Sequence, residues 1–205
     1  MKEQYFAPLD FYQQTYTIKK SDFICLIYPV SNTEQVNHYL TVAKQNFKKA
    51  THYTYAYQFG LSNLPTIKYN DDGEPNGSAG LQIFNAIKQN QLDNTLIIII
   101  RYFGGIKLGL SHLRQAYHEL ANKIIKEANI HQYHLYTKYQ LKLSYSQFNK
   151  YQSWIQENAY MVENIQYLED VNLTVVLDSG QYFQSQLEKL INQTINLNQI
   201  DTNYY

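Results

Sequence analysis

The stretch TLIIIIRYFGGIKLGLSHLR, residues 95–114, begins with a run of five aliphatic residues, Leu96–Ile100. This run is rich in β-branched side chains and apolar on both faces, which is typical of a central strand covered on both sides. Glycines follow it, and from Leu113 to Ala128 apolar residues recur with helical spacing. Ser111 is placed to act as the N-cap of that helix. The stretch therefore predicts a buried strand, a glycine-rich loop and a long amphipathic helix.

The residues before this stretch predict further elements of the same α+β domain. Tyr16–Val30 is strand-like but is interrupted by the polar residues KKSD. Residues 52–59, HYTYAYQF, alternate with period two and predict another strand. Between them, apolar residues from Val36 to Phe47 form a helical stripe, which Ser31 and Glu34 precede as a potential capping box.

The second half of the chain predicts the order strand, helix, strand, strand, helix, strand, which is the ferredoxin-like arrangement. The expected segments are residues 138–145, 148–155, 161–168, 171–177, 183–191 and 195–200. We expect two domains, an N-terminal domain of residues 1–132 and a ferredoxin-like C-terminal domain of residues 133–205.

Composition and charge indicate a globular chain and exclude some classes of function. Hydrophobic residues make up 44% and charged residues 17% of the 205 residues, and the formal net charge is zero, which argues against indiscriminate nucleic-acid binding. Up to Tyr133 there are 13 Lys and Arg against 10 Asp and Glu, or +3; from His134 there are 4 against 7, or −3. No apolar run reaches membrane length and no secretory signal is visible. Cys25, the only cysteine, lies in an apolar run that predicts a buried thiol, and we expect a cytoplasmic protein.

A second glycine-rich stretch, NDDGEPNGSAG, occupies residues 70–80. Its simplest interpretation is a turn, because Asp-Gly tolerates positive φ and Pro75 restricts the next step. An EF-hand is excluded, because aligning Gly73 with the loop glycine places Lys68 at the first ligand position. Asp71, Asp72 and Glu74 could still hold a divalent metal loosely. The end of the stretch predicts a short helix that Ser78 caps.

The loop RYFGGIKLG, residues 101–109, matches neither a phosphate-binding P-loop nor a dinucleotide fingerprint. It predicts a backbone concavity with Arg101, Lys107 and Arg114 around it, which suits a phosphate or a carboxylate. Alternatively, the acids of residues 70–80 pair with Arg101 or Lys107 and form an internal clasp that needs no ligand. Both interpretations remain open at this point.

No catalytic set of side chains is visible. The six histidines are scattered, and no nucleophile motif of the Gly-x-Ser-x-Gly type occurs. Tyr53, Tyr55, Tyr57 and Phe59 share one face of a predicted strand, where sheet packing is favoured over stacking on bases. We expect no cofactor and no resident metal.

The two glycine-rich loops together carry a family resemblance. DDGEPNGSAG followed by RYFGGIKLG resembles the paired signature of the Impact family, in its bacterial YigZ-like branch, and KKSDFICLIYPV and ATHYTYAYQFG resemble two further blocks. The resemblance implies an N-terminal domain like the second domain of a small-subunit ribosomal protein. It also implies a ferredoxin-like C-terminal domain similar to one in elongation factor G.

The loop residues define a candidate contact set, either for an anion or RNA or for an internal clasp. These residues are Asp72, Gly73, Glu74, Pro75, Ser78, Ala79, Gly80, Arg101, Tyr102, Phe103, Gly104, Gly105, Lys107, Gly109 and Arg114. The chain departs from the family pattern where Ser111 and His112 replace a glycine pair and Gln115 replaces an arginine.

The resemblance implies a non-enzymatic protein that acts on translation through the ribosome, RNA or a translation-related protein. Eukaryotic relatives regulate translation by competing for the activator of a starvation-responsive kinase. We expect no membrane partner and no recognition of DNA sequence. The alternative is a metal-dependent hydrolase-like enzyme that uses Asp71, Asp72 and Glu74.

Overall fold

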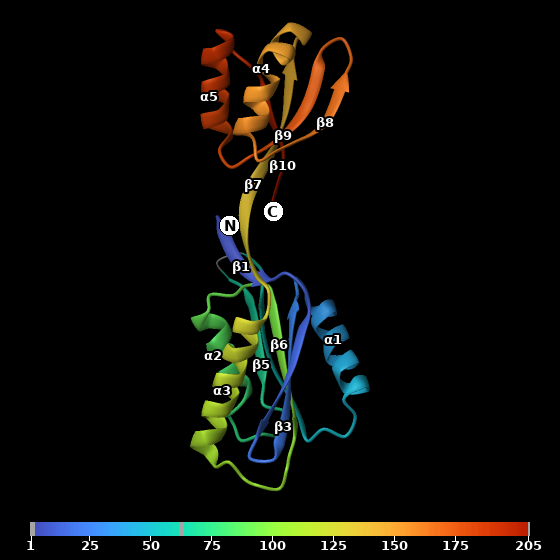
Figure 1. Cartoon of the computed structure of the whole chain (residues 1–205), viewed down its shortest axis with the longest axis vertical. Coiled ribbons are helices and arrows are strands. Elements are labelled where there is room, and N and C mark those ends of the chain that lie inside the picture. The colour runs from blue at the N-terminus through green and yellow to red at the C-terminus, as the bar shows by residue number, and fades with distance from the viewer. Residues whose placement is uncertain (1–2, 62–63, 205) are drawn as a thin grey trace. The chain divides into compact units, whose positions relative to one another are not determined.

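The structure is a computed structural model that describes residues 3–61 and 64–204. The chain divides into two compact units, Met1–Tyr133 and His134–Tyr205. Both units mix helices and strands, so the protein is an α+β protein of two domains (Figure 1). Among the residues that the structure describes, no helix combines the length and the apolar character needed to cross a membrane.

The first unit is built on a five-stranded sheet in the order β2-β3-β6-β4-β5, in which every neighbouring pair is antiparallel. The strands are β2 (Tyr12–Ile18), β3 (Ser21–Pro29), β6 (Thr95–Tyr102), β4 (His52–Phe59) and β5 (Thr66–Asn70). β6 is the central strand, which confirms the prediction from its apolar run. Lys19 and Lys20 form the turn between β2 and β3, and Ser21 and Asp22 begin β3, so the interrupted strand-like run is a hairpin.

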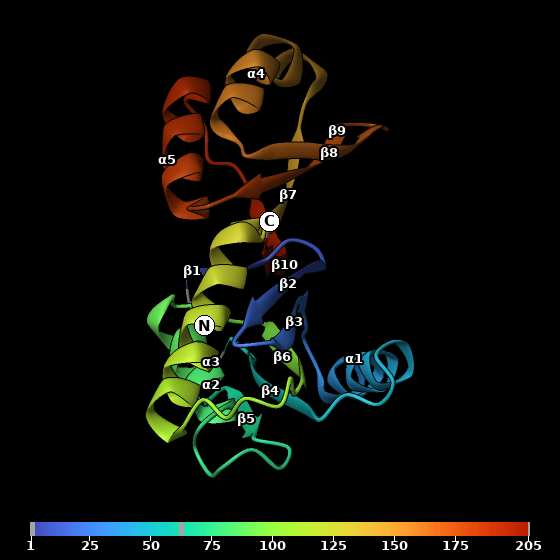
Figure 2. The same ribbon diagram turned by 60° about the horizontal axis from the view of Figure 1, so that its bottom comes forward.

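The two faces of β6 belong to two different cores, because successive side chains of a strand point in opposite directions. Ile97 and Ile99 pack with α2 (Gly80–Gln89) and α3 (Leu110–Glu127). Ile98 and Ile100 pack with α1 (Thr33–Asn46). Figures 1 and 2 show α1 on one side of this sheet and the other two helices on the opposite side. The isoleucine run is therefore buried from both sides.

Other apolar groups complete these cores. Cys25 is fully buried between the sheet and the pair α2 and α3, which confirms the prediction of a buried thiol. The aromatic residues of β4 pack in the core beside α1, where Tyr57 lies between Tyr55 and Phe59 in a row of stacked rings.

Two helices begin differently from the sequence-based expectation. For α1 the N-cap is Asn32, whose side chain accepts the Gln35 N–H at 2.9 Å, so the predicted capping box of Ser31 and Glu34 is wrong. For α3 the N-cap position is Gly109, with φ +80°, and Ser111 lies inside the first turn. A glycine at that position allows the left-handed backbone that leads the chain from the loop into the helix.

Two strands have no counterpart in the sequence-based expectation. β5 is exposed along its whole length, so it lacks the alternation that marks a half-buried strand. β1 (Gln4–Pro8) pairs with β7 (Ile130–Leu143), and Tyr5 stacks on Tyr133 near the start of that strand. Its partner is more than a hundred residues away, and no local pattern points to it.

The second unit is ferredoxin-like. Its elements follow the order β7, α4 (Tyr145–Asn158), β8 (Met161–Tyr167), β9 (Val171–Leu177), α5 (Gly180–Ile191) and β10 (Leu197–Tyr204). The strands are arranged as β10-β7-β9-β8 with antiparallel neighbours, and one apolar core gathers the helices onto the sheet. The expected βαββαβ order is confirmed, and the last strand extends beyond the expected residue 200.

Candidate functional site

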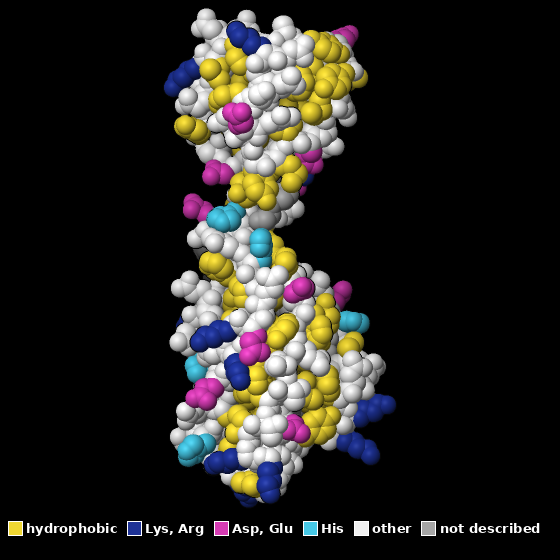
Figure 3. Space-filling view, viewed as in Figure 1, with side chains coloured by type: hydrophobic (Ala, Val, Ile, Leu, Met, Phe, Trp, Pro, Cys, Tyr) yellow, Lys and Arg dark blue, Asp and Glu magenta, His cyan; other side chains and the backbone are white. Residues whose placement is uncertain are grey.

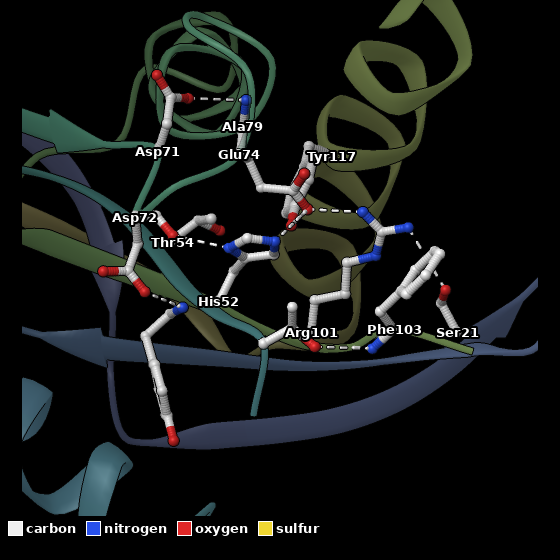
Figure 4. A network of polar contacts seen from close by, with 12 residues as sticks. Ser21, His52, Thr54, Asp71, Asp72, Glu74, Ala79, Arg101, Phe103 and Tyr117 are labelled. Carbon is white, nitrogen blue, oxygen red and sulfur yellow. Dashed lines mark hydrogen bonds and ion pairs between the residues drawn. The ribbon is translucent and has the colours of Figure 1, made fainter. Parts of the chain in front are cut away.

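The two glycine-rich loops meet at the end of β6, where a buried ion pair joins them (Figure 4). The Arg101 Nη1 group donates to the Glu74 Oε1 atom at 2.7 Å, and the two side chains are only 5% and 4% exposed. The Tyr117 hydroxyl of α3 donates to the same carboxylate oxygen at 2.8 Å. The loops, β6 and α3 are thus tied together at one carboxylate.

The groups around the Glu74 carboxylate include a tyrosine that stays protonated and a histidine. Burial, together with the negative charge of Glu74, raises the pKa of Tyr117 well above its ordinary value of 10.0. Tyr117 therefore stays protonated and remains a hydrogen-bond donor. His52 of β4 is nearby, with its Nε2 atom 3.9 Å from Glu74 Oε1, and its Nδ1 atom lies 2.7 Å from the backbone oxygen of Asp72.

The Arg101 guanidinium lies close to two aromatic rings. Its Cζ atom is 5.2 Å from the ring centre of Phe23 and 5.3 Å from that of Phe103. Its Nη2 group reaches Ser21 Oγ at 3.4 Å, whereas the buried Nε has no hydrogen-bond partner in the described part of the chain. The positive charge of Arg101 is therefore matched inside the protein by Glu74.

The side chain of Asp71, in the loop before α2, accepts hydrogen bonds at the start of this helix. Its carboxylate accepts the backbone N–H groups of Gly77, Ala79 and Gly80 at 2.8–2.9 Å. The predicted cap, Ser78, is wrong: its buried hydroxyl has no partner among the described residues. The first turn of a helix has free N–H groups, and here a carboxylate six to nine residues upstream accepts from these three N–H groups.

Asp72 has a third, separate role. Its Oδ2 atom accepts the Tyr53 N–H at 2.6 Å, and this residue has a φ of +44°. The three acids of this loop thus bind an α-helix start, a strand backbone and an arginine respectively (Figure 4). In the described residues no group of three metal-ligating side chains comes together, so the hydrolase alternative receives no support from this loop.

Two glycines of the loops permit close approach of other backbone. A side chain at Gly104 would collide with the carbonyl of Lys20, and one at Gly80 would lie 2.6–2.7 Å from the backbone of Asn70. Gly105, at φ +86°, faces open space. Gly104 and Gly80 therefore serve the contact between chain segments.

A pocket of about 390 Å³ opens beside the ion pair. Arg101 and Glu74 form part of its wall, and its other lining residues are mostly apolar. These residues are Thr51, His52, Pro75, Phe103, Lys107, Leu108, Gly109, Leu110 and Leu113. Lys107 and Phe103 are exposed at the pocket. Arg114 is exposed near the start of α3, and Tyr102 donates its hydroxyl to the Lys48 carbonyl.

Sequence reasoning missed three members of the polar network, His52, Ser21 and Tyr117. Tyr117 carried only the signal of a core residue, since it belongs to the apolar stripe of α3. Ser21 and His52 stand at the first residues of β3 and β4, where no local pattern distinguishes them.

The comparison with known proteins assigns the family. The model of the Impact N-terminal domain matches residues 19–125, which is more than half of the chain. The chain belongs to the Impact family. The resemblance seen in the two loops is thereby confirmed, and both loops lie within the matched range. A second model, a domain of unknown function named DUF1949, matches residues 141–193 of the ferredoxin-like unit.

Relatives in the Impact family match across both units. The IMPACT family member YvyE of Bacillus subtilis is 29% identical over 178 residues, covering 87% of this chain and 82% of its own. The IMPACT family member YigZ of Escherichia coli is 25% identical over 164 residues, covering 80% of each chain. A crystal structure of a hypothetical protein matches with a TM-score of 0.65 at 23% identity, covering 98% of this chain and 99% of that chain, which shows the shared fold.

Proposed function

We propose that this Impact family member is a non-enzymatic binding protein of the translation apparatus. We also propose that the surface of its first domain at the C-terminal end of β6 contacts ribosomal RNA. The observation that carries the proposal is a set of exposed cations gathered beside the pocket at this end. A protein surface that binds RNA needs positive charges that contact the phosphates and flat apolar groups on which the bases stack.

Three connections and the helix α3 supply the cations. They are Lys19 and Lys20 in the β2–β3 turn, Lys48 and Lys49 before β4, Lys107 in the β6–α3 loop and Arg114 near the start of α3. All six are exposed, and within residues 3–61 and 64–204 none of them forms an ion pair. Figure 3 shows Lys and Arg side chains at this end of the first domain.

Contacts hold these connections beside the end of β6. The Lys20 carbonyl is beside Gly104, the Lys48 carbonyl accepts the Tyr102 hydroxyl at 3.0 Å, and Lys107 lines the pocket. Two exposed acids, Asp22 and Asp72, lie near the same end, which leaves an excess of positive charge. This excess supports an anionic partner although the net charge of the whole chain is zero.

The pocket supports RNA over a simple anion. Phe103 is 42% exposed at its rim, and an exposed aromatic ring beside cations suits stacking on an unpaired base. The role in phosphate contact falls to Lys107 and its neighbours and not to Arg101, because Glu74 neutralises Arg101 inside the protein.

The test is co-sedimentation of the pure protein with ribosomes over a range of salt concentrations. The wild type is expected to pellet with a steep salt dependence, because each phosphate contact contributes a slope of about 0.7 in log K against log salt. Lys20→Gln/Lys107→Gln removes two such contacts and is expected to lower this slope by roughly 1.4. Phe103→Leu keeps an apolar side chain against Arg101 and is expected to weaken binding by about 1–3 kcal/mol through lost stacking.

The matched control is Lys88→Gln/Lys126→Gln, which removes the same charge from the last turns of α2 and α3. It is expected to bind like the wild type, and melting curves of all variants verify that they fold. Binding that is insensitive to salt, or equal loss in both double variants, contradicts the proposal. Binding that survives nuclease digestion of the RNA would point to a protein partner instead.

A further inference from the structure

A second pocket lies within the ferredoxin-like domain, where α4 ends and α5 begins. Its volume is about 390 Å³, and its lining is aromatic and acidic. The aromatic members are Trp154, Tyr136, Tyr160, Tyr182 and Phe183, and the acidic members are Glu157 and Asp178. No Lys or Arg belongs to its described lining.

Four of the aromatic rings pack against one another in two pairs. Tyr136 and Tyr160 stack with ring centres 4.2 Å apart, and Trp154 packs on the buried Phe183 at 5.2 Å. Tyr182 is 66% exposed at the mouth of the pocket. Aromatic faces carry negative electrostatic potential, so rings around a pocket favour a cation over an anion.

The two carboxylates add to this negative potential. Glu157 and Asp178 are exposed, and neither forms an ion pair or hydrogen bond with another described residue. Other acids of this domain do have partners: Glu163 pairs with Lys138, and Asp170 pairs with Lys142. Among the described residues, the two carboxylates of the pocket therefore have no Lys or Arg side chain paired with them.

The position of Glu157 is unfavourable for the helix that carries it. Glu157 lies in the last turn of α4, and this turn contains no basic residue. The carbonyl groups at a helix C-terminus already carry partial negative charge, so an acid there is destabilising. The opposite partial charge at the start of α5 is met by the Ser179 cap and the adjacent Asp178. The end of α4 thus presents negative charge to the pocket.

We propose that this pocket binds an arginine side chain of a basic segment in a partner protein. A guanidinium group is planar, so it can stack on the tyrosine and tryptophan rings while its N–H groups reach the two carboxylates. The charge of the domain supports a basic protein as the occupant, since the chain from His134 onward has 4 Lys and Arg against 7 Asp and Glu. Binding of arginine at this pocket requires no RNA contact by the first domain.

The chain contains a reporter for this pocket, because Trp154 is its only tryptophan. We would titrate the full chain with the peptide acetyl-Gly-Arg-Gly-amide and follow tryptophan emission under excitation that spares tyrosine. The neutral twin, with citrulline in place of arginine, has nearly the same shape without the charge. The arginine peptide is expected to change the emission saturably and to bind at least about tenfold more tightly than its twin.

Two variants test the carboxylates. Glu157→Gln and Asp178→Asn are each expected to weaken binding of the arginine peptide by roughly fivefold to tenfold. The control Glu169→Gln removes the same charge from the exposed β8–β9 connection and is expected to leave binding unchanged. Glu157→Gln is also expected to melt at the same or a slightly higher temperature, because it relieves the unfavourable charge at the end of α4.

Several results would overturn the proposal. Equal binding of the citrulline twin would show that charge plays no part. Equal loss in Glu169→Gln would assign the effect to the general charge of the domain. Binding of spermidine that is tighter than binding of the arginine peptide would identify the site as one for a free polyamine.

Discussion

At the scale of single residues, the end of β6 is organised by one buried carboxylate. Glu74 accepts hydrogen bonds from Arg101 and Tyr117, which come from a strand and a helix 27 and 43 residues away in the sequence. When a buried charge loses its partner, the free-energy cost of its desolvation is no longer offset by an attractive interaction. Substitutions here consequently affect the fold first, and a binding defect in Arg101→Ala would not identify a contact residue.

The ion pair gives a stability prediction. Glu74→Gln and Arg101→Met are each expected to lower the free energy of unfolding by about 3–5 kcal/mol, because each leaves the other charge buried and unpaired. The double variant is expected to lose less than the sum of the two. Urea unfolding followed by far-UV circular dichroism measures this, since Trp154 is in the second domain and does not report on the first.

A control for this pair is Tyr117→Phe, which removes one donor but keeps the salt bridge. It is expected to cost about 1.5–3 kcal/mol, the usual range for a hydrogen bond to a charged group. If the single variants of Glu74 and Arg101 each lower the free energy of unfolding by less than about 1 kcal/mol, the prediction is contradicted, because such a small loss is typical of an exposed salt bridge.

At the scale of elements, α2 shows how a loop can set a helix start. The N-cap residue, Ala79, has no side-chain oxygen, and Asp71 supplies the acceptor from the preceding loop. The same loop residue therefore determines both the turn and the helix that follows it.

The helix start provides the second stability prediction. Asp71→Ala is expected to cost about 1–2 kcal/mol, because three backbone N–H groups lose their acceptor. Ser78→Ala is expected to be close to neutral, because the Ser78 hydroxyl makes no hydrogen bond in the described residues. Thermal melts of the two variants compare them directly, and the reverse order of costs would show that Ser78 is the true cap.

At the scale of the whole molecule, the two domains have separate apolar cores, and buried tyrosines belong to the cores of the first domain. Burial raises the pKa of Tyr28 to about 12 and raises the pKa of Cys25, also mainly through burial. These groups are neutral in the folded protein at neutral pH. The unfolded chain releases their protons at ordinary values of 10.0 and 9.0.

Alkaline pH is therefore expected to destabilise the first domain. The sign follows from linkage: above the ordinary values the folded state binds more protons than the unfolded state, so stability falls as pH rises. Below pH 9.0 this contribution is fully present, and it is lost progressively toward pH 12. Melting temperatures are expected to be nearly constant from about pH 7 to 9 and to fall steeply above 10. A melting temperature that rises over this upper range would contradict the assignment of neutral buried tyrosines.

The sequence by itself determined the parts of this protein that depend on neighbours close in the chain. The stripe of α3 and the βαββαβ order follow from periods of two or of three to four residues, which burial on a strand or helix imposes. The central strand β6 and the buried Cys25 follow from continuous apolar runs, which are typical of strands covered on both faces. The paired loop motifs were enough to identify the family.

Only the tertiary structure decided which groups meet across long distances in the sequence. It selected Glu74 and not Asp71 or Asp72 as the partner of Arg101, and it assigned Asp71 to the start of α2. It also gathered lysines from separate connections at one end of the first sheet, and aromatic rings and acids at one end of the second domain. The physical reason is that a carboxylate has no preferred partner until packing removes water and leaves one donor within reach.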